Sequence, residues 1–216
     1  MRKLVNQYMW MLTGALFVPV VVKCVMMWDG GNGAAALGAK LPHYLMLPLI
    51  VTGAVALINY LEAKIIVDAD GVSPLRRVLM LTISLFLYIH AVTLMIPLTR
   101  ENLPLISMLV FCGIGVFFVL LGVLMPSLKR NRVAGVRYSW TLSDPEVWRD
   151  SNRIGGRYTI AMGVILLVSA FIPQRREMIF STFELWAFIV YVAALTLHSR
   201  LIAFKKHPPT DNGPGL

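Results

Sequence analysis

Residues 125–157 read MPSLKRNRVAGVRYSWTLSDPEVWRDSNRIGGR and form the only long polar segment in an otherwise apolar sequence. Seven basic side chains fall within it, namely Lys129, Arg130, Arg132, Arg137, Arg149, Arg153 and Arg157. Three acids accompany them, Asp144, Glu146 and Asp150, so the segment carries a net charge of +4. Because apolar stretches flank the segment on both sides, its position indicates a polar connection between membrane-embedded parts of the chain.

The composition excludes an ordinary soluble protein. Hydrophobic residues make up 57% of the chain, its mean hydropathy is +0.71, and only 14% of its residues are charged. Soluble proteins carry roughly 25% charged residues. The charges gather in short segments between apolar runs of about twenty residues, which is the length needed to cross a hydrocarbon core of about 30 Å. These features predict an all-α membrane protein that crosses the bilayer several times.

Six apolar stretches are long enough to be transmembrane helices. The expected spans are residues 8–27, 43–61, 78–97, 105–125, 154–171 and 179–201. We expect the first to be retained rather than cleaved as a signal peptide, because Lys23 interrupts it and its length suffices to span. Pro48 is expected to bend the second span. Between the spans the composition predicts an exposed loop at 28–42, a turn at Asp70-Gly71 and a tight turn at 173–177.

The distribution of Lys and Arg predicts the orientation. With six spans both termini lie on one side of the membrane, and 15 of the basic residues fall on that side against 4 on the other. Cytoplasmic loops of membrane proteins collect basic residues, so we expect both termini in the cytoplasm. This topology also explains the net charge of +9 without a nucleic-acid partner.

A second pattern concerns the helix expected to lead from the polar segment into the fifth span. Ser143 and Glu146 have the spacing of a capping box, and Pro145 suits the first turn of a helix. Arg149, Arg153 and Arg157 recur every four residues and so form one stripe. Three small residues with the same spacing, Gly155, Thr159 and Gly163, lie on the opposite face. We therefore expect the helix to pack through its small face and to present the arginines to the headgroup region.

Two interpretations of the arginines remain open. They can anchor the segment to anionic lipid, at about 1 kcal/mol per residue. Alternatively, the segment is a folded docking site for an acidic partner or a lipid headgroup, with Arg137 and Arg153 buried within it. Gly135, Trp140 and Trp148 favour a folded segment, because a purely electrostatic anchor needs neither tryptophans nor a helix cap.

The segment also resembles a known family. The pattern Asn131-x-x-x-Gly135-x-Arg137 is followed by Trp140-Thr141-Leu142, by Glu146-Val147-Trp148-Arg149, and by Arg153 through Gly156. This pattern is similar to the signature of the SdpI family, bacterial inner-membrane immunity and signalling proteins, over residues of about 113–172. Residues 33–49, GAAALGAKLPHYLMLPL, are a degenerate likeness of the first outer loop of the family's N-terminal domain and lack the His expected before the glycines.

The resemblance implies resistance to a peptide toxin on the outer side, sequestration of a cytoplasmic regulator at the membrane, or both. It divides the chain into an N-terminal three-helix part (1–103) and an SdpI-like membrane domain (104–206) with its loop at 126–157. The Pro- and Gly-rich composition of residues 207–216 predicts a disordered tail. The residues that it marks as partner-binding or loop-structuring are Asn131, Gly135, Arg137, Trp140, Thr141, Trp148, Arg149, Arg153, Gly156 and Arg157.

Rival functions stay open at this point. Lys23 is the one charge well inside a span, and Glu184 lies about one turn into the sixth span from the same side. Paired across the bundle, they would serve a small transporter or lipid-handling protein. Alternatively, Lys23 lies near enough to the outer end of its span to extend its ammonium group to the membrane surface. A structural subunit of a larger membrane complex is a third alternative, and a homo-oligomer is compatible with a chain of this size. We expect no enzyme, cofactor or metal, since no catalytic motif is recognisable and His90 and His198 lack ligand spacing.

Overall fold

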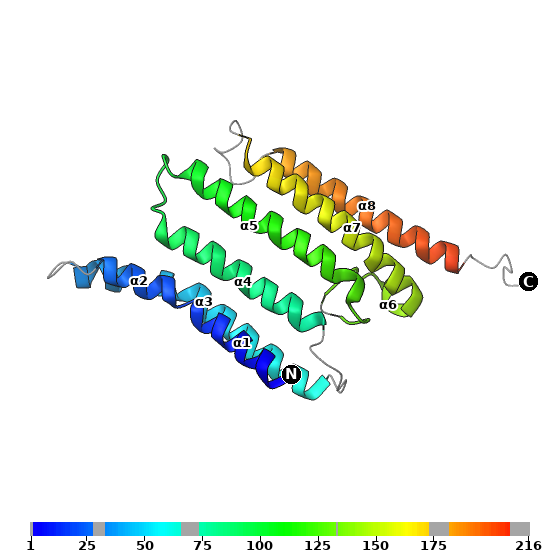
Figure 1. Cartoon of the computed structure of the whole chain (residues 1–216), viewed down its shortest axis with the longest axis horizontal. Coiled ribbons are helices and arrows are strands. Elements are labelled where there is room, and N and C mark those ends of the chain that lie inside the picture. The colour runs from blue at the N-terminus through cyan, green and yellow to red at the C-terminus, as the bar shows by residue number, and fades with distance from the viewer. Residues whose placement is uncertain (1, 28–32, 66–73, 133, 173–181, 208–216) are drawn as a thin grey trace, which may run out of the picture. The chain divides into compact units, whose positions relative to one another are not determined.

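The computed structural model describes residues 2–27, 33–65, 74–132, 134–172 and 182–207, and the regular elements in these ranges are all helical (Figure 1). Five helical stretches are long and apolar enough to cross a membrane. The prediction of an all-α membrane protein is therefore confirmed. The chain divides into two compact units, Met1–Gly113 and Ile114–Leu216, and the border between them falls within one helix.

The first unit begins with a broken helix. The first predicted span consists of α1 (Arg2–Ala15) and α2 (Val18–Met27), with Leu16 and Phe17 between them. Pro19 lies in the first turn of α2, where its missing N–H costs nothing. The Leu16 and Phe17 N–H groups donate to the carbonyls of Thr13 and Gly14, which closes α1 with a tighter final turn.

The helix α3 (Gly33–Ile65) corrects the prediction of a loop at 28–42. Residues 33–42 are helical, and Pro42 and Pro48 lie inside the same continuous helix. Alanine, which fills positions 34–36, has the highest helix propensity, and a backbone near hydrocarbon must satisfy its polar groups internally. The alanines of this stretch therefore outweigh its glycines in deciding the local structure. Residues 28–32 and the turns predicted at Asp70-Gly71 and at 173–177 lie outside the described residues.

The remaining helices of the first unit form a hairpin. After α4 (Pro74–Met95) a short link leads into α5 (Leu103–Leu124). The Tyr88 hydroxyl donates to the Leu109 carbonyl at 2.8 Å, so the two helices lie side by side. The core of this unit comprises buried side chains of α1, α3 and α4 and of the link after α1, namely Met9, Leu16, Val51, Val55 and Ile83. The third and fourth predicted spans are thus helices where expected.

The second unit contains the polar segment and the last two long helices. The end of α5 is followed by a single 3₁₀ turn, η1 (Met125–Ser127), and by the short helix α6 (Ser139–Ser143). Then come α7 (Pro145–Ala170) and α8 (Thr182–Lys206), which lie side by side along their lengths (Figure 1). The helix α7 thus combines the predicted amphipathic start with the fifth span, and α8 corresponds to the sixth.

The capping box predicted from Ser143 and Glu146 is wrong by one residue. The N-cap of α7 is Asp144, whose Oδ1 accepts the N–H groups of Glu146 at 2.6 Å and Val147 at 3.1 Å. Ser143 belongs to α6, where its hydroxyl donates to the Trp140 carbonyl. The extended backbone of Asp144 breaks the two helices apart, and Pro145 starts the second one as predicted.

The small face of α7 is its packing face, as predicted, because Gly155, Thr159 and Gly163 are all buried. A Cβ added at Gly163 would lie 2.7 Å from the Gly115 carbonyl oxygen, and one at Gly156 would lie 2.5 Å from the Gly122 carbonyl oxygen. The α5 and α7 backbones therefore approach within a distance that only glycine permits at both points.

This geometry predicts that Gly156→Ala destabilises the protein by about 1–3 kcal/mol, because the added methyl group meets backbone rather than a flexible side chain. Helix propensity alone would favour alanine by about 1 kcal/mol. Thermal unfolding in a mild detergent measures the difference. The matched control is Gly53→Ala, since a Cβ at Gly53 has nothing within 4 Å and should leave stability unchanged or raised. Equal melting of wild type and Gly156→Ala would contradict the packing argument.

Candidate functional site

Residues 125–132 and 134–157 fold into a compact polar layer around Trp148. This side chain is 2% exposed, and its indole N–H donates to the Leu128 carbonyl at 2.8 Å. The bond ties the start of α7 to the chain that follows η1. Because a buried indole N–H needs an acceptor, the tryptophan both fills the layer and fixes the path of the loop beside it. The predicted folded segment is confirmed by this packing.

The peptide groups of Val136 are satisfied by two side chains. The buried Asn152 accepts the Val136 N–H at 3.1 Å through Oδ1 and donates to the Trp148 carbonyl at 2.9 Å through Nδ2. The fully buried Thr141 hydroxyl donates to the Val136 carbonyl at 2.6 Å. Gly135, with a φ of +106°, precedes this peptide and leaves no room for a Cβ against Asn152. The backbone N–H and carbonyl of the buried Val136 therefore both have partners.

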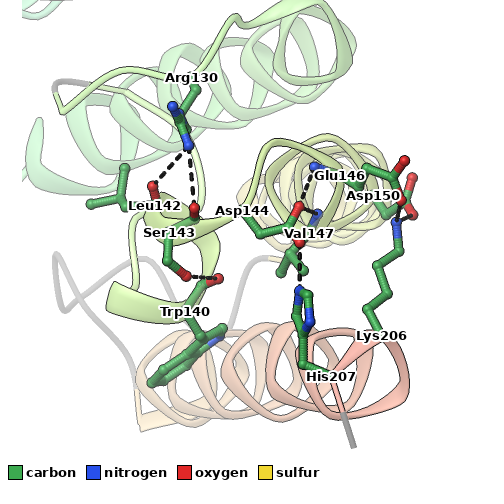
Figure 2. Close-up of polar contacts among 10 residues, drawn as sticks. All are labelled: Arg130, Trp140, Leu142, Ser143, Asp144, Glu146, Val147, Asp150, Lys206 and His207. Carbon is green, nitrogen blue, oxygen red and sulfur yellow. Dashed lines mark hydrogen bonds and ion pairs between the residues drawn. The ribbon is translucent and has the colours of Figure 1, made fainter.

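The outer part of the loop is held by local contacts. The Asn131 side chain accepts the Ala134 N–H and donates to the Lys129 carbonyl, both at 2.8 Å. Arg130 donates to the carbonyls of Leu142 and Ser143 at the end of α6 (Figure 2). These bonds satisfy helix-terminal carbonyls that lack partners within a helix. Asn131 thus shapes the turn, as its place in the signature suggests.

The helix α6 rests against α8. The ring of Trp140 stacks on Tyr138 with a centroid distance of 4.7 Å, and its indole N–H donates to Ser199 at 3.2 Å. The Arg200 guanidinium carbon lies 4.8 Å from the centre of the same ring, a cation–π geometry. The hydroxyls of Tyr138 and Thr196 are hydrogen-bonded. Trp140, the other tryptophan of the signature, therefore joins the loop to the last helix.

The acids of the segment are engaged by the end of α8 (Figure 2). The Lys206 Nζ lies 3.0 Å from Glu146 Oε2 and 2.8 Å from Asp150 Oδ2, while His207 Nε2 lies 2.5 Å from Asp144 Oδ2. All three acids thus face the two basic residues where α8 ends. His207, expected to begin a disordered tail, is placed by this contact, and the chain after it lies outside the described residues.

The contact with His207, followed by the hydrogen bond from the Val147 N–H, lowers the pKa of the Asp144 carboxyl from 3.8 to about 2. A carboxylate at the start of a helix also interacts favourably with the helix dipole. The stabilisation that comes from this lowered pKa is complete above about pH 4 and is lost as the pH falls toward 2.

The arginines of α7 are exposed. Arg149, Arg153 and Arg157, which we call the arginine face, all project from the helix, and Arg149 lies 3.6 Å from Asp150. Arg137 is also exposed and donates to the Arg132 carbonyl at 2.9 Å. The prediction that Arg137 and Arg153 are buried is therefore wrong, because the interior of the loop is filled by Trp148, Asn152 and Thr141 instead.

The other predicted site residues divide by role. Gly156 is buried against the α5 backbone and so serves packing rather than partner contact. Lys23 belongs to the first unit and Glu184 to the second, and their pairing stays a prediction. Glu184 is 4% exposed, and its Oε2 has no hydrogen-bond partner among the described residues. His198 Nδ1 is 2.8 Å from the Tyr158 hydroxyl, which makes it an interhelical contact.

Two sets of structural contacts were not predicted from the sequence: those of Asn152, and those of Lys206 and His207. Asn152 shares the buried face of α7 with Gly156 and Thr159. The helical periodicity of the sequence places this polar residue on the buried face, which is a signal that it forms buried hydrogen bonds. The contacts of Lys206 and His207 with α7 had no such signal, because they join positions about 60 residues apart.

Comparison with known proteins identifies this unit. The SdpI/YfhL protein family matches residues 127–201. The immunity protein SdpI of Bacillus subtilis (strain 168) is 30% identical to this chain over 149 residues, which is 67% of each protein. This chain belongs to the SdpI family. No solved structure shows a significant match. The SdpI match begins in η1 and ends in α8, so it covers the polar layer together with the two helices that hold it.

The SdpI-family layer carries exposed arginine side chains. The described residues contain no group of three or more His, Cys, Asp or Glu side chains that could hold a metal ion. What the layer offers is an ordered surface with exposed guanidinium groups, each able to form paired hydrogen bonds with a carboxylate or phosphate.

The central hydrogen bonds of this SdpI layer can be tested with Asn152→Ala. The substitution leaves the buried Val136 N–H without an acceptor and should destabilise the protein by about 1–3 kcal/mol. Thermal unfolding followed by Trp fluorescence gives the measurement. Ser127→Ala, which removes an exposed hydroxyl, is the control and should change stability by less than about 0.5 kcal/mol. If both variants unfold like wild type, Asn152 does not hold the loop.

The contact between Asp144 and His207 predicts a pH effect. His207→Ala should raise the pKa of the Asp144 carboxyl from about 2 toward, but not to, its ordinary value, because the backbone N–H bonds remain. NMR titration of the aspartate carboxyl carbons measures this pKa, with Asp144→Asn assigning the signal. His43→Ala serves as control. An unchanged titration midpoint in His207→Ala would show that the backbone alone lowers this pKa.

Proposed function

We propose that this SdpI-family chain is an immunity protein of the bacterial inner membrane. It gives its host resistance to a peptide toxin, holds a cytoplasmic regulator at the membrane, or does both. The observation that carries the proposal is the 30% identity over 149 residues to a protein named for immunity. The match includes the polar layer, where the surface suited to a partner lies. In this proposal the protein acts by binding and not by catalysis.

We further propose six spans with both termini in the cytoplasm. Four spans correspond to α4, α5, α7 and α8, and the stretch Gln7–Met26 supplies another through α1 and α2. The sixth is α3, in which Lys40–Ala56 forms a shorter apolar stretch. The 15 to 4 distribution of basic residues supports this orientation. It places the polar layer in the cytoplasm.

The polar layer is proposed to receive an acidic partner on the arginine face. The three acids of the segment face Lys206 and His207, so they compensate charges of α8. Arg153 and Arg157 have no hydrogen-bond or ion-pair partner within the part of the chain that the structure describes. The donors of a guanidinium group are held in a planar fork, so less freedom is lost for each hydrogen bond that it forms with a carboxylate.

A toxin challenge tests this function. A sensitive bacterium expressing the wild-type chain is exposed to membrane-active peptide toxins while its membrane potential is recorded. We expect wild type to keep the membrane polarised and Arg153→Gln/Arg157→Gln to lose protection by at least about ten-fold in the tolerated toxin concentration, because the cytoplasmic acidic partner on which protection then depends is no longer bound.

The control variant is Arg100→Gln, an exposed arginine of the link between α4 and α5, which should protect as well as wild type at equal membrane levels. Loss of potential in the wild-type strain with every peptide would overturn the immunity proposal. Protection by wild type and by the double variant alike would leave immunity standing and would refute the role of the arginine face.

A further inference from the structure

A cavity of about 710 Å³ lies in the first unit, remote in sequence from the polar layer. It forms where the end of α2, the early part of α3 and the end of α4 converge. Its polar lining residues are Lys23, Lys40, His43, Tyr44 and Thr93, and its apolar ones are Leu94, Ile96, Pro97 and Leu98. The volume is within the range of about 300–1,000 Å³ typical of small-molecule sites, so a group larger than a single ion fits.

The lining of the cavity is positively charged. Lys40, His43 and Tyr44 have the spacing i, i+3, i+4 and therefore share one face of α3. The half-buried Lys23 approaches from α2. Among the described residues no acid lines the cavity, and neither lysine forms an ion pair with a residue that the structure describes. An ammonium group partly withdrawn from water without a counter-charge is costly, so the cavity favours an anion.

The surroundings of the cavity are apolar. Next to Lys23 on α2, the side chains of Val21, Val25 and Met26 are 59%, 69% and 70% exposed. At the other wall, Leu98 is 74% exposed. Side chains of this kind at the end of a membrane helix pack against acyl chains. The expected ligand is therefore an amphiphile with an anionic group, rather than a free ion or an acidic peptide.

We propose that this cavity binds the headgroup of an anionic phospholipid such as phosphatidylglycerol. Its phosphate interacts with Lys23 and Lys40, and its acyl chains lie along the exposed apolar side chains of α2. The site is separate from the proposed immunity function and does not depend on it. In the proposed orientation it faces the outer leaflet.

Native mass spectrometry of the detergent-solubilised full chain tests the site. Wild type is titrated with phosphatidylglycerol and with phosphatidylcholine of the same chain length. We expect tighter binding of phosphatidylglycerol, weakened roughly five-fold in Lys23→Gln or Lys40→Gln and roughly 25-fold in the double variant. Lys23→Arg/Lys40→Arg should keep most of the affinity.

Arg100→Gln is the matched control, because it removes an exposed charge after α4 that does not line the cavity. Free glycerol phosphate separates the headgroup from the whole lipid and should bind at least ten-fold more weakly. The proposal is overturned if the double Gln variant binds like wild type, if phosphatidylcholine binds equally well, if glycerol phosphate alone matches the lipid, or if Arg100→Gln weakens binding as much as the double variant.

Discussion

The second unit depends on how the backbone N–H and carbonyl of one buried residue, Val136, are satisfied. The loop before α6 has no helical or sheet partner, so the Val136 N–H and carbonyl must find side chains. Asn152 and Thr141 supply them, and Asn152 also binds the Trp148 carbonyl. Because Thr141 lies within α6, the same bonds place α6 against α7 and bring Trp140 to α8. A single constraint thus connects the loop with both long helices of this unit.

The packing of α7 against α8 also brings acidic side chains of the second unit close to basic ones. The N-terminal turns of α7 carry acids, and the last turn of α8 carries Lys206. Each charge interacts favourably with the dipole of its own helix, and the acids and the lysine also attract one another. Exposed ion pairs of this kind contribute little to stability. Their consequence is geometric, since the acids turn toward α8 and leave Arg153 and Arg157, on the same helix, without an ion-pair partner among the described residues.

The long elements could be predicted because each depends on local pattern. Apolar runs gave the spans, and four-residue spacing gave both faces of α7. The predictions that were wrong depended on neighbouring side chains. Asp144 caps α7 instead of Ser143, and the side chains of Arg137 and Arg153 are exposed rather than buried. The loop prediction for residues 33–42 was wrong for a different reason. It rested on the glycines, although the alanines beside them favour a helix. The role of Asn152 needed a tertiary partner 16 residues away.

The choice of basic residue bears on whether the polar layer anchors or docks. An anchor to anionic lipid uses lysine and arginine almost equally, since each contributes about 1 kcal/mol through its charge. Yet six of the seven basic residues at 125–157 are arginine, whereas the rest of the chain has six lysines and seven arginines. Arginine differs from lysine in its planar, two-pronged donor geometry and weaker hydration. Those properties matter for paired contacts with carboxylates, so the composition of the layer favours a specific acidic partner over a general attraction to the bilayer.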